Sequence, residues 1–195
     1  MVSLDDIKKL RSITSAGMMD CKSALEESGG NIEKAIEILR KKGIAKASKK
    51  EGNELGDGVV ESYIHDGGRL GVLVELGCQT DFVARNDEFK KLAREIAIHI
   101  AASNPLYISR DTVPDDVLEK EKEIARESLK NEKKPQEIVE RIVESKIDKF
   151  FEENCLMEQR FFRDESVVVG DLIKEYIAKF GENIKVIRFA RFQVK

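Results

Sequence analysis

Apolar residues in the first 45 positions recur at three- and four-residue intervals, which is the spacing of one face of an α-helix. Three such repeats occur, and glycines separate them. The residues expected to face inward are Leu4, Ile7, Leu10, Ile13, Cys21, Ala24, Leu25, Ile32, Ala35, Ile36 and Leu39. Residues that can cap a helix precede or open the repeats, namely Ser3, Asp20 and Asn31. The pattern predicts a three-helix module over residues 1–45, with its last helix ending at Gly43.

A hairpin is the next predicted element. Residues 46–56 lose the helical repeat and are rich in Lys and Gly, which predicts a solvated linker. Two β-branched segments, 59–64 and 70–76, then flank Asp66-Gly67-Gly68, an arrangement typical of an antiparallel hairpin. After the hairpin, one long amphipathic helix is predicted from Phe82 to Ala102.

The rest of the chain is mainly helical in pattern. Residues 114–134 are charge-dense and predict a solvent-exposed helix, whereas residues 136–154 predict a more strongly amphipathic one. Together they predict a helical insert at about residues 106–154. A further helix over 166–180 ends at Gly181, and residues 186–194 predict a terminal strand. We therefore expect an α+β fold, whose core domain over residues 57–195 has a small antiparallel sheet of about three strands covered by helices.

Charge and hydropathy exclude several classes of protein. The chain has 195 residues, 36% of them charged, and a net charge of −3. No apolar run reaches the roughly 18 residues of a membrane span, and no signal-peptide pattern opens the chain, so we expect a cytoplasmic protein. Residues 1–50 hold eleven basic and seven acidic side chains, but the chain has no Trp and no basic stripe with interleaved aromatic residues. Direct nucleic-acid binding is therefore not expected.

Residues that could carry chemistry are few and scattered. Cys21, Cys78 and Cys155 form no CxxC pair, which argues for buried reduced thiols rather than for disulfides or a zinc site. The two histidines, His65 and His99, have no neighbouring Cys or second His and are expected to be surface or structural residues. No phosphate-binding glycine motif occurs. The sequence predicts a protein without a catalytic site, a metal or a cofactor.

The run from Gln79 to Asp87 lies where the second hairpin strand gives way to a helical pattern. Thr80 or Asp81 can act as the N-cap, with its side-chain oxygen accepting a hydrogen bond from the first turn. Phe82 precedes Phe89 by seven residues, so helical periodicity favours a buried position for it. The alternative is a ring exposed at the end of a rigid strand, where it could contact another protein. Periodicity alone leaves both interpretations open.

Three separated stretches resemble one family. They are residues 16–27 (AGMMDCKSALEE), residues 79–86 (QTDFVARN), and residues 180–184 (FGENI) followed by Arg188. In this order they resemble bacterial translation elongation factor Ts over essentially the whole chain. The resemblance implies a ubiquitin-associated-like fold for the N-terminal module. It also implies guanine-nucleotide exchange on elongation factor Tu, in which GDP is released so that GTP can bind.

The resemblance also implies which residues contact the partner. Those matching Asp81 and Phe82 intrude between helices of the GTPase domain and disturb its Mg²⁺ site. The full set of expected contacts is Arg11, Met18, Met19, Thr80, Asp81, Phe82, Val83, Phe180 and Gly181. Position 180 is Phe here, where an aliphatic residue is also common in the family. The chain is short for the family, which implies a homodimer that binds two GTPases in a 2:2 complex.

Two rival functions fit parts of the pattern. A ubiquitin-associated-type adaptor would capture helices or nascent chains through Met18 and Met19, with the core as a scaffold. A small hydrolase would need a nucleophile beside a base, and the sequence offers no such pair.

Overall fold

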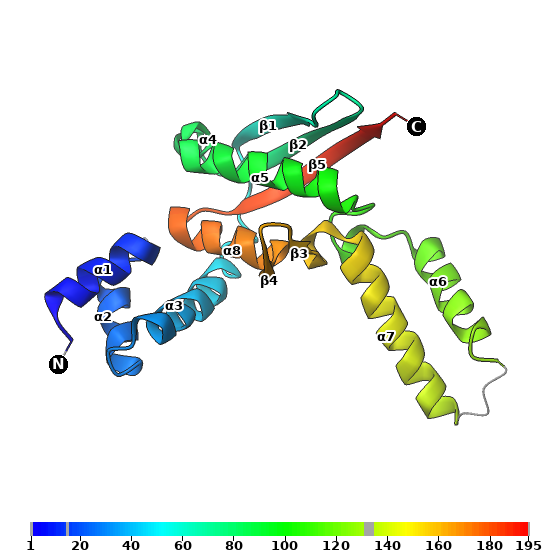
Figure 1. Cartoon of the computed structure of the whole chain (residues 1–195), viewed down its shortest axis with the longest axis horizontal. Helices are drawn as coiled ribbons and strands as arrows, with labels where there is room; N and C mark the ends of the chain where they lie inside the picture. The colour runs from blue at the N-terminus through cyan, green and yellow to red at the C-terminus, as the bar shows by residue number, and fades with distance from the viewer. Residues whose placement is uncertain (1, 15, 131–134, 195) are drawn as a thin grey trace. The chain divides into compact units, whose positions relative to one another are not determined.

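The computed structural model describes residues 2–14, 16–130 and 135–194. Helices and a small three-stranded antiparallel sheet make up this part of the chain, which confirms the predicted α+β class (Figure 1). The chain divides into two compact units. Unit 1 consists of residues 1–59, 76–90 and 171–185, and unit 2 consists of residues 60–75, 91–170 and 186–195.

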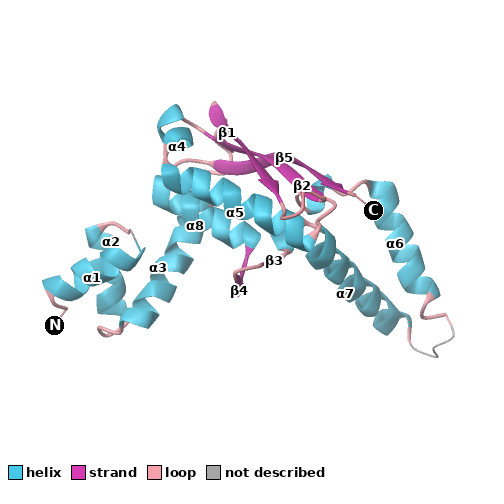
Figure 2. Ribbon diagram, turned by 45° about the horizontal axis from the view of Figure 1, so that its top comes forward, coloured by secondary structure: helices cyan, strands magenta, loops and turns pink. Residues whose placement is uncertain are grey.

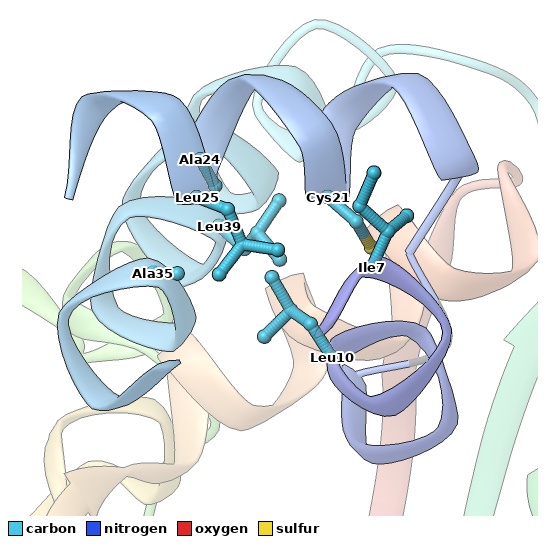
Figure 3. Close-up of a cluster of buried hydrophobic side chains, with 7 residues drawn as sticks. All are labelled: Ile7, Leu10, Cys21, Ala24, Leu25, Ala35 and Leu39. Atoms are coloured by element: carbon cyan, nitrogen blue, oxygen red, sulfur yellow. The ribbon is translucent and has the colours of Figure 1, made fainter. Parts of the chain in front are cut away.

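Unit 1 begins with the predicted three helices, α1 (Leu4–Thr14), α2 (Met18–Glu27) and α3 (Ile32–Ala47). Their buried side chains form one cluster, consisting of Ile7, Leu10, Cys21, Ala24, Leu25, Ala35 and Leu39 (Figure 3). Two predicted caps are confirmed. The Ser3 hydroxyl accepts a hydrogen bond from the Asp6 amide at 3.0 Å, and Asn31 Oδ1 accepts one from the Lys34 amide at 2.9 Å.

Three details of this module differ from the prediction. Leu4 and Ile13 are 67% and 55% exposed, because only the middle of the α1 stripe reaches the cluster. The N-cap of α2 is Gly17, so Asp20 lies in the first turn instead of capping it. Helix α3 continues through Gly43 to Ala47. A Cβ atom at position 43 would lie 3.3 Å from that of Ala178, so this glycine permits close packing and does not end the helix.

The hairpin is confirmed as β1 (Asp57–Ile64) and β2 (Leu70–Cys78). Its turn is closed by a hydrogen bond from the His65 amide to the Leu70 carbonyl at 2.8 Å. The terminal strand β5 (Ile184–Gln193) completes the sheet in the order β1-β2-β5, so β2 is central. Val72 and Val74 on this central strand are buried, whereas Leu73 between them is 48% exposed. One face of the sheet therefore carries apolar core and the other carries exposed side chains.

The single helix predicted from Phe82 to Ala102 is two helices, α4 (Asp81–Arg85) and α5 (Asp87–Ser103). The fully buried stripe of α5 consists of Phe89, Leu92, Ala93, Ile96, Ala97 and Ile100. The helix ends where predicted, before Asn104, whose φ is 48°. Asn tolerates this left-handed conformation better than most residues with a side chain.

The predicted helical insert in unit 2 consists of α6 (Asp115–Glu127) and α7 (Gln136–Asn154), which lie side by side (Figure 2). They share a cluster of buried residues, namely Val113, Ala125, Leu129, Val143, Ile147, Phe151 and Cys155. The first helix is therefore amphipathic, not simply solvent-exposed. Residues 131–134 of the predicted segment lie outside the described part of the chain.

An arginine connects the segments at the two ends of the helical insert. Arg110, in the short helix η1 (Arg110–Thr112), donates two hydrogen bonds of 3.0 Å to Glu158 of η2 (Leu156–Glu158). It donates a third, of 2.8 Å, to Asp148, and its guanidinium lies 4.6 Å from the centre of the Phe151 ring. Glu158 and then Asp148 raise the pKa of Arg110. The helical insert thus has its own buried cluster, and Arg110 fixes the segments where it joins the rest of unit 2.

The remaining elements are β3 (Arg160–Phe161), β4 (Asp164–Val168) and α8 (Val169–Phe180). The strands β3 and β4 pair antiparallel, and neither was predicted. Ser166, the expected start of the helix, lies in β4. Among the described residues no helix is long and apolar enough to cross a membrane. The three cysteines are buried, as predicted, and burial raises the pKa values of Cys78 and Cys155 to about 11.

Candidate partner-binding site

Among the described residues, Phe82 is the most exposed of the large apolar side chains, with 83% of its surface accessible. It lies on α4, the short helix that follows the end of β2 (Figure 1). Phe89, seven residues later, is fully buried. The core position that helical periodicity favours for Phe82 is therefore wrong.

The cause is a single backbone turn at Asn86. Its ψ of 132° is extended, so α4 stops there and α5 begins in another direction. The residue stabilises both helices, since its amide donates to the Val83 carbonyl at 3.0 Å and its Oδ1 accepts from the Glu88 amide at 2.8 Å. Because the helix is interrupted, residues seven apart no longer share a face, and Phe82 is free to point outward.

The opposite side of α4 is anchored. Val83 and Ala84 are 7% and 5% exposed, so they fix the helix while Phe82 remains accessible. Asp81 lies 3.2 Å from Arg85 one turn later. Thr80 is the N-cap, but its side chain makes no capping bond, contrary to the prediction. Its hydroxyl donates to Glu182.

Phe180 and Gly181 lie at the end of α8, in the same unit as α4. The Phe180 ring is half-buried and meets the edge of the Phe89 ring, with the centroids 6.3 Å apart. Gly181 has a φ of 74° and its amide donates to the Ile177 carbonyl at 2.8 Å, which is the left-handed stop of a helix. Lys179 also pairs with Glu88 at 2.8 Å. The late glycine motif therefore packs beside the first turn of α5.

Arg11, Met18 and Met19 lie on the three-helix module, on α1 and α2. Arg11 is exposed, and the two methionines are 37% and 75% exposed. Leu4 and Ile13 add two further exposed apolar side chains to this module. Sequence reasoning missed them as surface residues, because they extend a stripe whose middle is buried.

The two histidines lie in different environments. His65 is exposed and its Nδ1 lies 2.9 Å from the Tyr63 hydroxyl, while His99 is buried beside Gln159. Within residues 2–14, 16–130 and 135–194, no three His, Cys, Asp or Glu side chains gather as they would around a metal ion. The exposed ring of Phe82 is what distinguishes this region from an ordinary surface.

Sequence reasoning gave no role to three polar residues that the structure connects to α4. Gln79 precedes Thr80, and Glu182 and Asn183 follow Gly181. Hydrogen bonds join Thr80 to Glu182 and Gln79 to Asn183 across about a hundred residues of sequence. Their presence within two of the three resembling stretches was the available signal, but spacing along the chain gives no indication of such pairing.

Comparison with known proteins identifies the family of the chain. The family model described as "Elongation factor TS" matches residues 2–195. The chain is 58% identical to elongation factor Ts of Thermosipho melanesiensis, over 100% of this chain and 99% of that protein. It is 55% identical to elongation factor Ts of Fervidobacterium nodosum, over 99% and 98% of the two chains, and 56% identical to that of Caldanaerobacter subterraneus, over 99% and 96%. The chain belongs to the elongation factor Ts family.

Proposed function

We propose that this protein is a translation elongation factor and the guanine-nucleotide exchange factor of elongation factor Tu. It binds the GDP complex of that GTPase, disturbs the Mg²⁺ site and promotes release of GDP. The observation that carries this proposal is the exposed ring of Phe82, held on a short anchored helix at the end of a central strand. An apolar ring kept in water on a rigid support is suited to insertion into another protein.

Exchange of this kind is a coupling between two binding events. If the factor weakens nucleotide binding by some ratio, the nucleotide weakens factor binding by the same ratio. The inserted ring must therefore be tolerated better by the nucleotide-free GTPase than by the loaded one. Mg²⁺ requires nearly ideal octahedral geometry, with phosphate oxygens among its ligands. A small displacement of the surrounding groups therefore weakens the binding of Mg²⁺. No covalent step is involved, and the protein is accordingly proposed not to be an enzyme.

Phe82→Ala tests the proposal. Burying a Phe side chain contributes about 1.5–3 kcal/mol, so its loss is expected to lower stimulated GDP release at least about tenfold. Release of a fluorescent GDP analogue from elongation factor Tu, at several Mg²⁺ concentrations, measures the effect. Ile124→Ala is the matched control, because Ile124 is an apolar residue of α6 that is 51% exposed. Unchanged release with Phe82→Ala would remove the ring from the mechanism.

The other expected contacts have supporting roles in this proposal. Asp81 presents its carboxylate beside Phe82, and buried Val83 supports the helix from behind. Met18 and Met19 are flexible apolar side chains that suit a second contact with the same GTPase domain, and Arg11 is an exposed residue of the same three-helix module. Phe180 and Gly181 support the start of α5. We expect cytoplasmic action without direct binding of nucleic acid.

A homodimer that binds two GTPases is also part of the proposal. Ile64, Leu73, Phe192 and Val194, all in unit 2, line one shallow groove at the end of the sheet. Each of the four is between 48% and 69% exposed. Exposed apolar side chains that line one groove support self-association of this surface.

The adaptor alternative draws support from the apolar surface of the three-helix module, where Met19 is 75% exposed. It makes a different prediction for the same variant. An adaptor that captures helices through the module would be unaffected by Phe82→Ala, and Met19→Asp would abolish its binding. Exchange instead depends on Phe82, so the pair of variants separates the two functions.

A further inference from the structure

Two segments 102 residues apart meet at Thr80, the residue that precedes α4. The Glu182 carboxylate accepts two hydrogen bonds from Thr80, one from the amide at 3.1 Å and one from the hydroxyl at 2.8 Å. Both residues belong to unit 1, and both are only partly accessible to solvent. A carboxylate that accepts two hydrogen bonds from one residue fixes that residue's position and its side-chain rotamer together.

The remaining polar atom of Thr80 is also used. Its carbonyl accepts the Ala84 amide at 3.2 Å, which is the first hydrogen bond of α4, and the buried Cys78 thiol at 3.3 Å. Thr80 thus connects the end of β2, the start of α4 and Glu182. Loss of Glu182 would leave both the amide and the hydroxyl of Thr80 without their partner.

A second bridge lies beside the first. Gln79 Oε1 accepts hydrogen bonds from the Asn183 amide at 2.8 Å and from Asn53 Nδ2 at 3.2 Å. Asn183 is fully buried, and its Nδ2 donates to the carbonyls of Glu51 at 3.1 Å and Asn53 at 2.6 Å. Residues 51–53, expected in a solvated linker, are therefore bound to the residues that follow Gly181.

Helix α4 needs these contacts because it has only five residues. A helix of one turn is unstable by itself, so its geometry must come from tertiary contacts. Val83 and Ala84 pack on one side, and Thr80 holds the N-terminal end. Without the Thr80 anchor, the N-terminal end of α4 would not be held, and the direction of the Phe82 ring would depend on Val83 and Ala84 alone.

We propose that Glu182 is a positioning residue for nucleotide exchange, which holds Thr80 and so keeps the Phe82 ring pointing outward. This inference rests on the proposed exchange function. It gives the late glycine motif a role within the protein itself: Gly181 turns the chain so that Glu182 and Asn183 reach the residues before α4. Glu182 acts through Thr80 and need not touch the partner.

Three substitutions test the proposal. Glu182→Gln keeps the size of the side chain but removes the charge and one acceptor, and Thr80→Val removes the hydroxyl but keeps the amide. Thr80→Ser keeps both donors. A hydrogen bond contributes about 1 kcal/mol, so Glu182→Gln and Thr80→Val should each lower the maximal rate of stimulated GDP release about fivefold. Thr80→Ser should recover most of the rate that Thr80→Val loses.

A merely structural role would give another pattern. Positioning predicts that the maximal rate falls more than the half-saturating concentration rises. It also predicts that hydrogen exchange at the amides of residues 80–84 becomes faster by more than the loss of global stability explains. The double variant Glu182→Gln/Thr80→Val should be no slower than the worse single variant, because both remove one contact. Glu54→Gln is the charge-matched control, because Glu54 is an exposed glutamate in the segment before β1.

The possible outcomes separate the two proposals. If the wild-type protein stimulates GDP release and Glu182→Gln stimulates it equally, positioning by Glu182 is overturned while the exchange function stands. Additive losses in the double variant, or losses that follow the unfolded fraction, would overturn it as well. If the wild-type protein itself leaves GDP release unchanged, both proposals fall.

Discussion

At the scale of single residues, burial determines the protonation of His99. It is fully buried on α5, with its ring 6.0 Å from that of Phe161. Gln159 donates from Nε2 to the Glu153 carbonyl at 2.7 Å, so its amide oxygen is the atom 3.0 Å from His99 Nε2. The imidazole therefore carries its proton on Nε2, and Nδ1 has no hydrogen-bond partner among the described residues. Burial lowers the pKa of His99.

This environment predicts a loss of stability in acid. Below a pH of about 6.5, the unfolded chain binds a proton at position 99 that the folded protein does not bind. As the pH is lowered in this range, the free energy of unfolding should decrease. His99 contributes at most about 1.4 kcal/mol per pH unit to this decrease. Urea unfolding at pH 7.5 and 5.5 measures it. The wild-type protein should lose more stability over this interval than His99→Gln. Equal losses for the two proteins would contradict the prediction.

At the scale of elements, the break between α4 and α5 decides what Phe82 does. The amphipathic pattern from Phe89 to Ile100 was predicted correctly, because periodicity reports a continuous buried stripe well. Extending that stripe back to Phe82 failed, because one extended ψ at Asn86 resets the direction of the chain. An isolated Asn in a helical pattern indicates a cap only weakly, so the sequence could not reveal the break.

Other elements show the same limit. The sequence predicts that the third helix ends at Gly43, but this residue lies inside α3, where its missing Cβ allows Ala178 to come close. Glycine serves both purposes, and only the tertiary neighbour distinguishes them. The two-residue strand β3 was missed because so short a segment shows no alternation. Among site residues, the resemblance identified Phe82, but no local pattern could reveal that Glu182 lies against Thr80.

Asn86→Ala tests the role of the break. The substitution removes the side chain that caps α5 and favours a continuous helix. We expect about 1 kcal/mol lower stability from the lost cap. Stimulated GDP release should also fall, because a continuous helix turns Phe82 toward the stripe of Phe89. Thermal unfolding and the GDP-release assay measure the two effects.

Asn86→Asp is the matched control, since its carboxylate also caps helices well. It should retain most of the release activity. If Asn86→Ala lost stability but released GDP at the wild-type rate, the break would be a structural detail without a role in presenting Phe82.

At the scale of the whole molecule, the apolar groove at the end of the sheet is expected to determine whether two chains associate. Full burial of a Val, Leu, Ile or Phe side chain contributes about 1.5–3 kcal/mol to the free energy of association. Association costs about 4–15 kcal/mol in lost freedom of motion, so several such side chains must be buried together. Ile64, Leu73, Phe192 and Val194 supply four in each chain. A second copy would double that number at a symmetric interface.

The proposed dimer is therefore expected to depend on these residues together. Phe192→Asp places a charge in the groove and should convert the protein into a monomer in sedimentation velocity at micromolar concentration. Ile124→Asp, which places the same charge on an exposed position of α6, should leave the dimer intact. A wild-type protein that sediments as a monomer would refute the dimer. Because Phe82 lies on α4, outside this groove, the monomeric Phe192→Asp variant should still stimulate GDP release if one chain suffices for one GTPase.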